Sequence, residues 1–164
     1  MKEDYSKIEV TCSLVPQSFD ELKSRELALV LKAKQARVTS HSPYSNYSVG
    51  AALLLGNGEI VSGSNQENAA YPSGLCAERT TMFAAGALYP GVNFEVLAVA
   101  IPDTAENLPS PCGACLQVMA EYQFKQESPL KILLIHPRED IVYVADKLQQ
   151  MLPFAFNQSH LPKK

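Results

Sequence analysis

The sequence lacks the features that would place it in a membrane, in the secretory pathway or on nucleic acid. No apolar run approaches the roughly 18 residues that a transmembrane helix requires. Residues 1–5 are charged and no apolar segment follows them, so we expect no secretory signal. The pI of about 5.6 and the absence of a Lys/Arg cluster argue against binding to phosphate backbones. We therefore expect a cytoplasmic protein with neither a membrane nor a nucleic-acid partner.

Charge and cysteine are also scarce. Charged residues make up 19% of the chain, below the average of roughly 25%, which hints at surface hidden in an oligomer. The 164 residues contain no internal repeat and no linker. We expect an N-terminal extension with a strand (1–18) and a single domain (19–164).

There are four cysteines. In a reducing compartment we expect metal ligands, nucleophiles or core residues rather than disulfides.

Hydrophobic periodicity predicts an α/β fold. The alternation over residues 8–14 indicates a half-buried strand with Cys12 on its apolar face, ended by Pro16. Residues 18–21 have capping-box spacing and predict a helix reaching almost to residue 40, with an apolar face that includes Leu31 and Val38. The elements predicted after it are strands 49–55 and 59–64, helix 76–88, strand 94–101, helix 113–124, strands 130–135 and 141–144, and helix 145–151. This order indicates a sheet with helices on both faces.

Three of the four cysteines fall at two predicted helix starts. Cys112 and Cys115 form a Cys-x-x-Cys at the start of helix 113–124, and Cys76 opens helix 76–88. Free N–H groups and the positive end of the helix dipole favour thiolates there. Three thiolates converging on one point would match a catalytic zinc, which keeps its fourth position for water.

Two charged residues beside Cys76 fit such a site. Glu78 follows Cys76 by two positions and could take and return the proton of a bound water. Three thiolates outnumber the two charges of Zn²⁺, and we expect Arg79 to offset the surplus negative charge.

Spacing alone leaves other interpretations open. The Cys-x-x-Cys could be a redox pair, or the four cysteines could be unrelated core residues. A closed structural zinc site would take its fourth ligand from Cys12, His41, His136 or His160. Alternative functions are deamination of another small aminated heterocycle, polynucleotide editing, and a non-catalytic zinc-binding module.

Five collinear motifs carry a resemblance to a known family. They are Ser42–Leu53, Asn65–Tyr71, Cys76–Thr80, Ser110–Cys115 and Leu152–Phe156. Cys-Ala-Glu followed by Pro-Cys-x-x-Cys is the all-cysteine form of the zinc nucleobase deaminase signature. The order and spacing of the motifs, over residues 22–156, resemble those of the small, homotetrameric, zinc-dependent cytidine deaminases.

This resemblance implies a three-layer α/β/α fold around a mixed five-stranded sheet. It also implies hydrolytic deamination of cytidine and deoxycytidine to uridine and deoxyuridine in pyrimidine salvage. Cys76, Cys112 and Cys115 would hold Zn²⁺, and the activated water would attack C4. Glu78 would shuttle protons to N3 and to the leaving ammonia. The expected assembly is a homotetramer with shared active sites.

The resemblance further implies contacts to a small nucleoside substrate. Asn65 and Glu67 would bind the ribose hydroxyls, and Ala77 would also contact the substrate. Tyr47, where the family usually has Phe, would stack on the base. Phe156 would cross a subunit interface to close a neighbour's pocket.

Two further departures from the family pattern concern charge and polarity. Leu116 stands where an Arg commonly follows the last zinc cysteine, and Gln66 replaces an apolar residue. Since Glu78 and Arg79 are present, we expect Leu116 to alter subunit contacts or zinc electrostatics rather than the chemistry.

Overall fold

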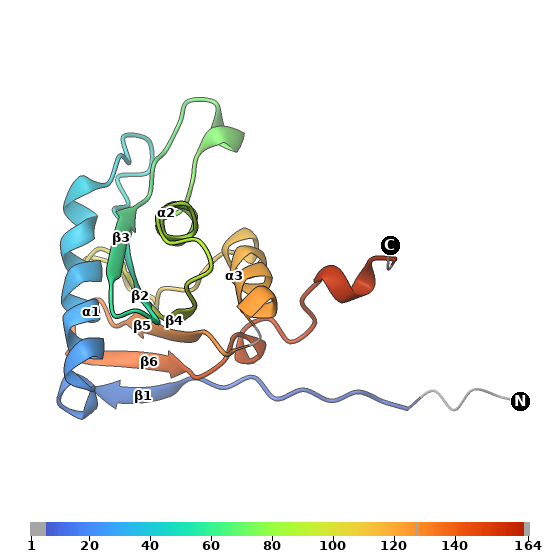
Figure 1. Cartoon of the computed structure of the whole chain (residues 1–164). Helices are drawn as coiled ribbons and strands as arrows, with labels where there is room; N and C mark the ends of the chain where they lie inside the picture. Colours follow the sequence, from blue (N-terminus) through green and yellow to red (C-terminus); the bar gives the residue numbers. More distant parts are fainter. Residues whose placement is uncertain (1–5, 127, 163–164) are drawn as a thin grey trace, which may run out of the picture.

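A mixed sheet of six strands lies between two layers of helices in the computed structural model, which describes residues 6–126 and 128–162 (Figure 1). The strands are β1 (Val15–Ser18), β2 (Gly50–Leu55), β3 (Ile60–Ser64), β4 (Phe94–Ala100), β5 (Lys131–Ile135) and β6 (Ile141–Ala145). The α-helices are α1 (Ser24–Ala36), α2 (Ala77–Leu88) and α3 (Gly113–Gln126). Short 3₁₀ helices occupy Phe19–Glu21, Arg37–Thr39, Tyr71–Ser73, Leu148–Gln150 and Gln158–His160.

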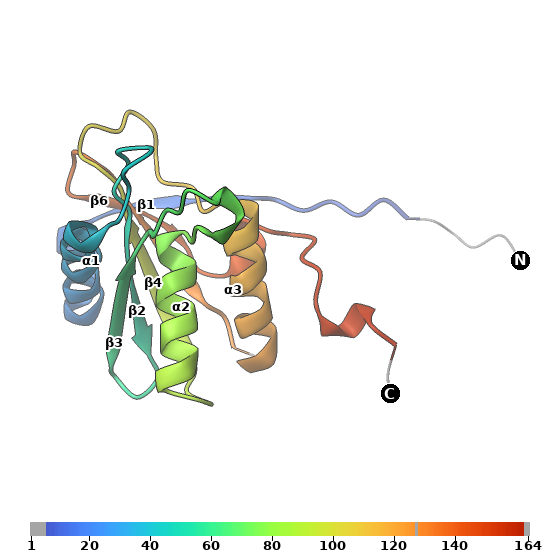
Figure 2. The same ribbon diagram turned by 90° about the horizontal axis from the view of Figure 1, so that it is seen from above.

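The sheet order is β1–β6–β5–β4–β2–β3. β4 and β5 pair in parallel, and the other four neighbouring pairs are antiparallel. Helix α1 covers one face of the sheet, and α2 and α3 cover the other (Figure 2). The expected α/β/α layering is confirmed. None of the helices in the described residues is long and apolar enough to cross a membrane.

Each face of the sheet has its own hydrophobic core. On the central strand β2, Leu53 and Leu55 face α2 and α3, whereas Ala52 and Leu54 face α1. All four side chains are buried, so this strand is apolar throughout.

The strand count of five was wrong, because β1 adds a sixth strand at the edge beside β6. The strand predicted at residues 8–14 is not formed, and Cys12, expected in a strand core, is exposed. The strand instead contains Pro16, which an edge position tolerates because one side of its backbone needs no ladder hydrogen bond. β1 falls in the predicted extension. The first five residues of that extension, and residues 163–164 of the predicted domain, lie outside the described residues.

The predicted first helix begins later than expected. The Glu21 carboxylate accepts a hydrogen bond from the Ser18 N–H at 2.7 Å, but this cap closes only a 3₁₀ turn. Leu31 and Val38, assigned to the apolar face, are 56% and 87% exposed. Near the C-terminus, residues 148–150 form a single 3₁₀ turn instead of the predicted helix.

Close packing against β3 fixes the start of α2, where Cys76, Glu78 and Arg79 lie. A Cβ atom on Gly63 would lie 2.8 Å from Thr81 Oγ1, so glycine is needed where strand and helix approach. The Thr80 hydroxyl donates to the Ser64 carbonyl at 2.9 Å, which fastens the first turn of the helix to the same strand.

Candidate active site

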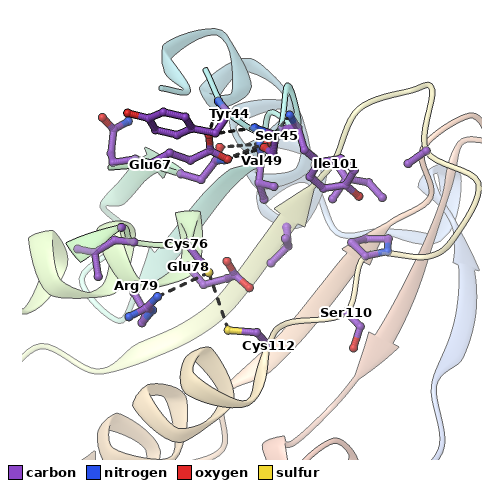
Figure 3. Close-up of a pocket in the computed structure, with 18 of the residues that line it drawn as sticks. Tyr44, Ser45, Val49, Glu67, Cys76, Glu78, Arg79, Ile101, Ser110 and Cys112 are labelled. Atoms are coloured by element: carbon purple, nitrogen blue, oxygen red, sulfur yellow. Dashed lines mark hydrogen bonds between the residues drawn. The ribbon is translucent and has the colours of Figure 1, made fainter. Parts of the chain in front are cut away.

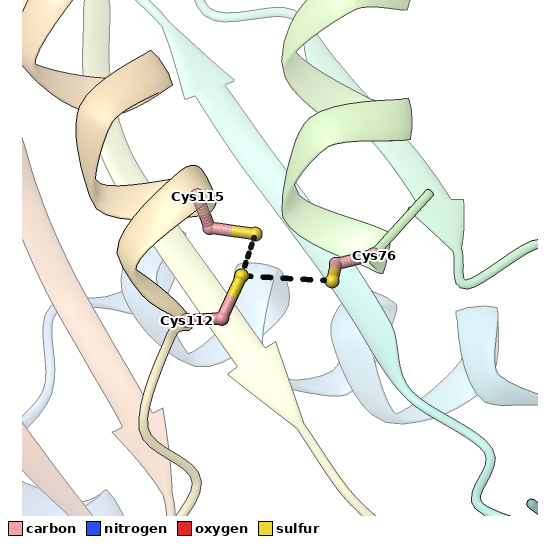
Figure 4. A group of neighbouring side chains, drawn as sticks. All are labelled: Cys76, Cys112 and Cys115. Carbon is pink, nitrogen blue, oxygen red and sulfur yellow. Dashed lines mark hydrogen bonds between the residues drawn. The ribbon is translucent and has the colours of Figure 1, made fainter. Parts of the chain in front are cut away.

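Three cysteine side chains converge where α2 and α3 begin (Figure 4). Cys76 is the N-cap residue of α2, and Cys112 immediately precedes α3. The Sγ atoms of Cys76 and Cys112 are 3.8 Å apart, and those of Cys112 and Cys115 are 3.5 Å apart. All three sulfur atoms lie within 4.8 Å of one another.

This spacing fits a tetrahedral zinc ion. Ligand atoms at the usual Zn–S distance of about 2.3 Å stand about 3.8 Å from one another in a tetrahedron. Among the described residues, no fourth His, Cys, Asp or Glu atom belongs to the group. The arrangement is thus a three-sulfur set with one open position, and none of the candidate fourth ligands for a closed structural site joins it.

The surroundings of the sulfur atoms favour the ionised form of the Cys76 thiol. A hydrogen bond with the Cys115 thiol lowers the pKa of Cys76 to about 5 against the opposing effect of burial, and a smaller contribution from Arg79 lowers it further. The same hydrogen bond, together with burial, raises the pKa of Cys115. Arg79 Nη2 lies 3.7 Å from Cys76 Sγ, so a guanidinium stands where surplus negative charge would gather.

Glu78 lies on the first turn of α2 with its side chain almost fully buried. Burial raises the pKa of its carboxyl, and the negative charge of Cys76 raises it further. A carboxyl group in such surroundings can hold a proton nearer neutral pH than an exposed one.

A cavity of about 1080 Å³ opens above these residues (Figure 3). Its floor contains Cys76, Glu78, Arg79 and Cys112, and Tyr44, Ser45 and Glu67 lie at the other end. Of the residues predicted to contact substrate, Tyr47, Asn65 and Glu67 line it. Ala77 is fully buried at the start of α2 and does not line it.

Glu67 is held by the turn that follows Pro43. Its carboxylate accepts hydrogen bonds from the Tyr44 and Ser45 N–H groups at 3.0 and 3.2 Å, and a short one from the Ser45 hydroxyl. The Ser45 hydroxyl bond is the main reason that the pKa of Glu67 is lowered. The carboxylate therefore stays ionised and retains lone pairs for a ligand hydroxyl.

Asn65 braces the chain around Tyr47. Its Oδ1 accepts from the Ser40 hydroxyl at 2.6 Å and the Val49 N–H at 2.8 Å, and its Nδ2 donates to the Tyr47 carbonyl at 2.9 Å. Three of the four hydrogen bonds that an Asn side chain can make are thus used by the protein, which leaves one N–H for a ligand.

Two of the singled-out side chains lie away from the cavity. Phe156 is 56% exposed, and its carbonyl accepts a hydrogen bond from Gln117 Nε2 at 2.8 Å. It is not among the residues that line its own chain's cavity. Leu116 is buried in the core between the sheet and the α2–α3 layer, where an arginine would need a partner for its charge.

Sequence reasoning missed the wall formed by residues 105–110. Its only sequence signal is its position directly before Pro111 and Cys112. Tyr44 and Tyr71 also line the cavity, and their rings contact edge to face with centroids 6.0 Å apart. Both lie in motifs that carry the resemblance, but nothing in their spacing assigned them a role.

Comparisons with known proteins agree on one family. Residues 23–128 match the profile described as "Cytidine and deoxycytidylate deaminase zinc-binding region". The chain is 41% identical to a cytidine deaminase of Halalkalibacterium halodurans over 129 residues, 78% of this chain and 91% of the relative. A cytidine deaminase of Sporosarcina psychrophila is also 41% identical, over 81% of this chain and 92% of its own. The crystal structure of cytidine deaminase from Burkholderia pseudomallei superposes with a TM-score of 0.69 at 40% identity, covering 79% of this chain and 97% of that one.

Proposed function

Because the chain belongs to the zinc-dependent cytidine and deoxycytidylate deaminase family, we propose that it hydrolyses cytidine and deoxycytidine to uridine and deoxyuridine, releasing ammonia, in pyrimidine salvage. The observation that carries the proposal is the three-sulfur set at zinc spacing beside a buried carboxyl on the floor of one cavity.

The chain's own residues divide the work of this reaction. Zinc held by the three cysteines would supply an activated water for attack on C4 of the cytosine ring. Glu78 would take a proton from that water and deliver protons to N3 and to the departing amino group. Its raised pKa suits both halves of the transfer. Arg79 would offset the negative charge of the sulfur ligands through its contact with Cys76.

Substrate recognition in this proposal rests on the polar end of the cavity. The ionised Glu67 would accept hydrogen bonds from ribose hydroxyls, and the remaining Asn65 N–H would donate one. Tyr47 would stack on the base. Polar groups that a bound ligand covers discriminate strongly, because a ligand without the hydroxyl leaves them unpaired.

We expect cytidine to be deaminated with a kcat/KM about 100-fold or more above that of free cytosine, since the ribose contacts are lost with the sugar. Glu67→Gln should reduce the ratio of the two kcat/KM values by lowering kcat/KM for cytidine and not for cytosine. Initial rates followed by ultraviolet absorbance give kcat/KM for both compounds. The matched control is Glu95→Gln, at an exposed position on β4. Equal turnover of cytosine and cytidine by the unmodified protein would contradict ribose recognition.

The proposed assembly is a homotetramer in which Phe156 closes a neighbour's cavity. Two observations support this. The cavity of a single chain, about 1080 Å³, slightly exceeds the roughly 300–1,000 Å³ usual for ligand sites. Phe156 is exposed and outside its own chain's cavity, with its backbone held by Gln117. A ring supplied from a second chain would reduce an open site to nucleoside size.

Phe156→Ala should raise KM for cytidine about 10- to 100-fold, the effect of losing a buried aromatic side chain worth about 1.5–3 kcal/mol. A complementation assay tests whether the Phe156 ring acts in the active site of its own chain or of a neighbouring chain. Glu78→Gln chains still carry Phe156, and Phe156→Ala chains still carry Glu78. Co-expressed, they should recover activity at low cytidine that neither homo-oligomer has. Mixed assemblies no more active than the separate variants would place Phe156 in its own chain's site.

A further inference from the structure

The wall that sequence reasoning missed is a loop without regular secondary structure. It runs from Pro102 to Ser110, between β4 and the start of α3. Six consecutive residues, 105–110, line the cavity, and the chain then leads directly to Cys112. Pro102 and Pro109 are buried and anchor the two ends, whereas Asp103, Glu106 and Asn107 are exposed. The position of this wall therefore depends on whatever holds the middle of the loop.

Two arginines from distant parts of the chain contact this middle segment. Arg37, just after α1, donates from Nη1 to the Asp103 carboxylate at 2.8 Å. Arg138, in the β5–β6 turn, donates from Nη2 to the Ala105 carbonyl at 3.3 Å. Together with Lys34 and Pro137, the two arginines and Asp103 line a second hollow, which contains three basic residues and one acidic residue. Two cations thus contact the loop.

Burial holds Arg37, and hydrogen bonds hold the turn that carries Arg138. The Arg37 side chain is only 20% exposed, although its partner Asp103 is 71% exposed. The β5–β6 turn is closed by His136, whose Nδ1 accepts hydrogen bonds from the Arg138 and Glu139 N–H groups. The charge of Arg37 also lowers the pKa of the Tyr47 phenol, against the larger, opposite effect of burial.

We propose that Arg37 and Arg138 are positioning residues that fasten the loop 102–110 against the cavity and so set the affinity for the nucleoside. The inference rests on the proposed function, because the cavity is taken as the substrate site. Neither arginine lines the cavity. They act by keeping residues 105–110 in place before substrate arrives, which spares the binding step the cost of ordering a loose loop.

Steady-state kinetics on cytidine separate positioning from chemistry. Arg37→Ala should raise KM about two- to fivefold with kcat nearly unchanged, the size expected for an ion pair that is partly exposed. Arg37→Ala/Arg138→Ala should raise KM about tenfold. Arg37→Lys keeps the charge and should recover part of the loss. The matched control is Arg25→Ala, an exposed arginine on α1 about 18 Å from Arg37 along the helix. A fall in kcat at constant KM would overturn the proposal.

A double-mutant cycle and a salt series test the contact itself. Asp103→Ala should raise KM as much as Arg37→Ala, and the double variant should be no worse than either. Because cytidine is uncharged, any effect of salt on KM must come from ion pairs within the protein rather than from attraction between protein and substrate. KM of the unmodified enzyme should rise at high ionic strength, and KM of Arg37→Ala should stay flat. Additive effects of the two substitutions on KM, or the same salt response in both proteins, would refute the proposal that the Arg37–Asp103 ion pair holds the loop.

Limited proteolysis tests the loop without any reaction. Glu106 is exposed in its middle, so a glutamate-specific protease should cut there whenever the loop opens. The fragment beginning at Asn107 should appear about two- to fivefold faster from Arg37→Ala than from the unmodified protein or Arg25→Ala. Equal rates would overturn the inference. If the unmodified protein fails to deaminate cytidine, the proposed function fails, and these cleavage rates still decide whether the arginines hold the loop.

Discussion

Replacing Glu78 with glutamine is expected to lower kcat for cytidine by about 10²- to 10⁴-fold, the usual contribution of a positioned acid–base group. Zinc content should stay at the level of the unmodified protein. Glutamine fills the same space on the first turn of α2 but cannot accept and return a proton. Steady-state kinetics with metal analysis of the same sample measure both quantities.

The control for this variant is Glu121→Gln, an exposed glutamate on α3. It changes the net charge equally and should leave both kcat and metal content unaltered. A Glu78→Gln protein that keeps its zinc and also keeps its kcat would show that another group moves the proton. A zinc-binding module without catalysis gives Glu78 no task, so this variant also separates that alternative from an enzyme.

The burial of Glu78 makes a large effect reasonable. The side chain is 4% exposed and lies beside the sulfur atoms, so little of its surface is open to water that could replace it in proton transfer. Its carboxyl pKa is raised chiefly by burial and additionally by the negative charge of Cys76. A group so placed is costly to keep ionised, and a catalytic role accounts for that cost better than a structural one.

Cys112→Ala is expected to abolish both zinc binding and deamination. The substitution removes one of three sulfur ligands, and we expect well below one zinc per chain. Zinc that binds only the folded protein stabilises it by about 4 kcal/mol when the metal is present at 1,000 times its Kd, and this stabilisation is lost when zinc no longer binds. The Tm should therefore fall by about 10 °C. Metal analysis, cytidine turnover and a thermal unfolding scan provide the three measurements.

Cys112 suits this test because it is exposed, so its removal leaves no cavity in the core. Cys115 is fully buried, and its truncation would mix metal loss with packing loss. Cys12→Ala is the matched control, since Cys12 is exposed and lies outside the cluster. Treating the unmodified protein with a chelator should lower the Tm to that of Cys112→Ala. A Cys112→Ala protein with full zinc would exclude the three-sulfur site.

The chemical part of the site could be predicted because its signals are local. Cys76 and Glu78 are two residues apart on one helical turn, and Cys112 and Cys115 lie three apart around the start of another. Helix periodicity brings the Cys112 and Cys115 side chains together, and Glu78 follows the N-cap residue Cys76 within the first turn of α2. The approach of the two pairs depends on sheet order, and it was the resemblance to a family that supplied this.

The parts that could not be predicted depend on distant contacts. The alternation of residues 8–14 indicates a strand, but no neighbouring strand pairs with it, and β6 pairs with residues 15–18 instead. The ion pair between Arg37 and Asp103 joins residues 66 positions apart, and sequence periodicity cannot predict such a contact. Val38 is hydrophobic at helical spacing yet exposed, since the helix had already changed to a 3₁₀ turn at Arg37.

The separation of Cys76 from Cys112 also orders the events of folding. The two sulfur-bearing residues are 36 positions apart in the sequence, and β4, in the middle of the sheet, lies between them. In the native fold their sulfur atoms meet where α3 lies beside α2 on the sheet that contains β4. We therefore expect the set of three ligands to be complete only late in folding. Bound zinc should then slow unfolding rather than speed folding.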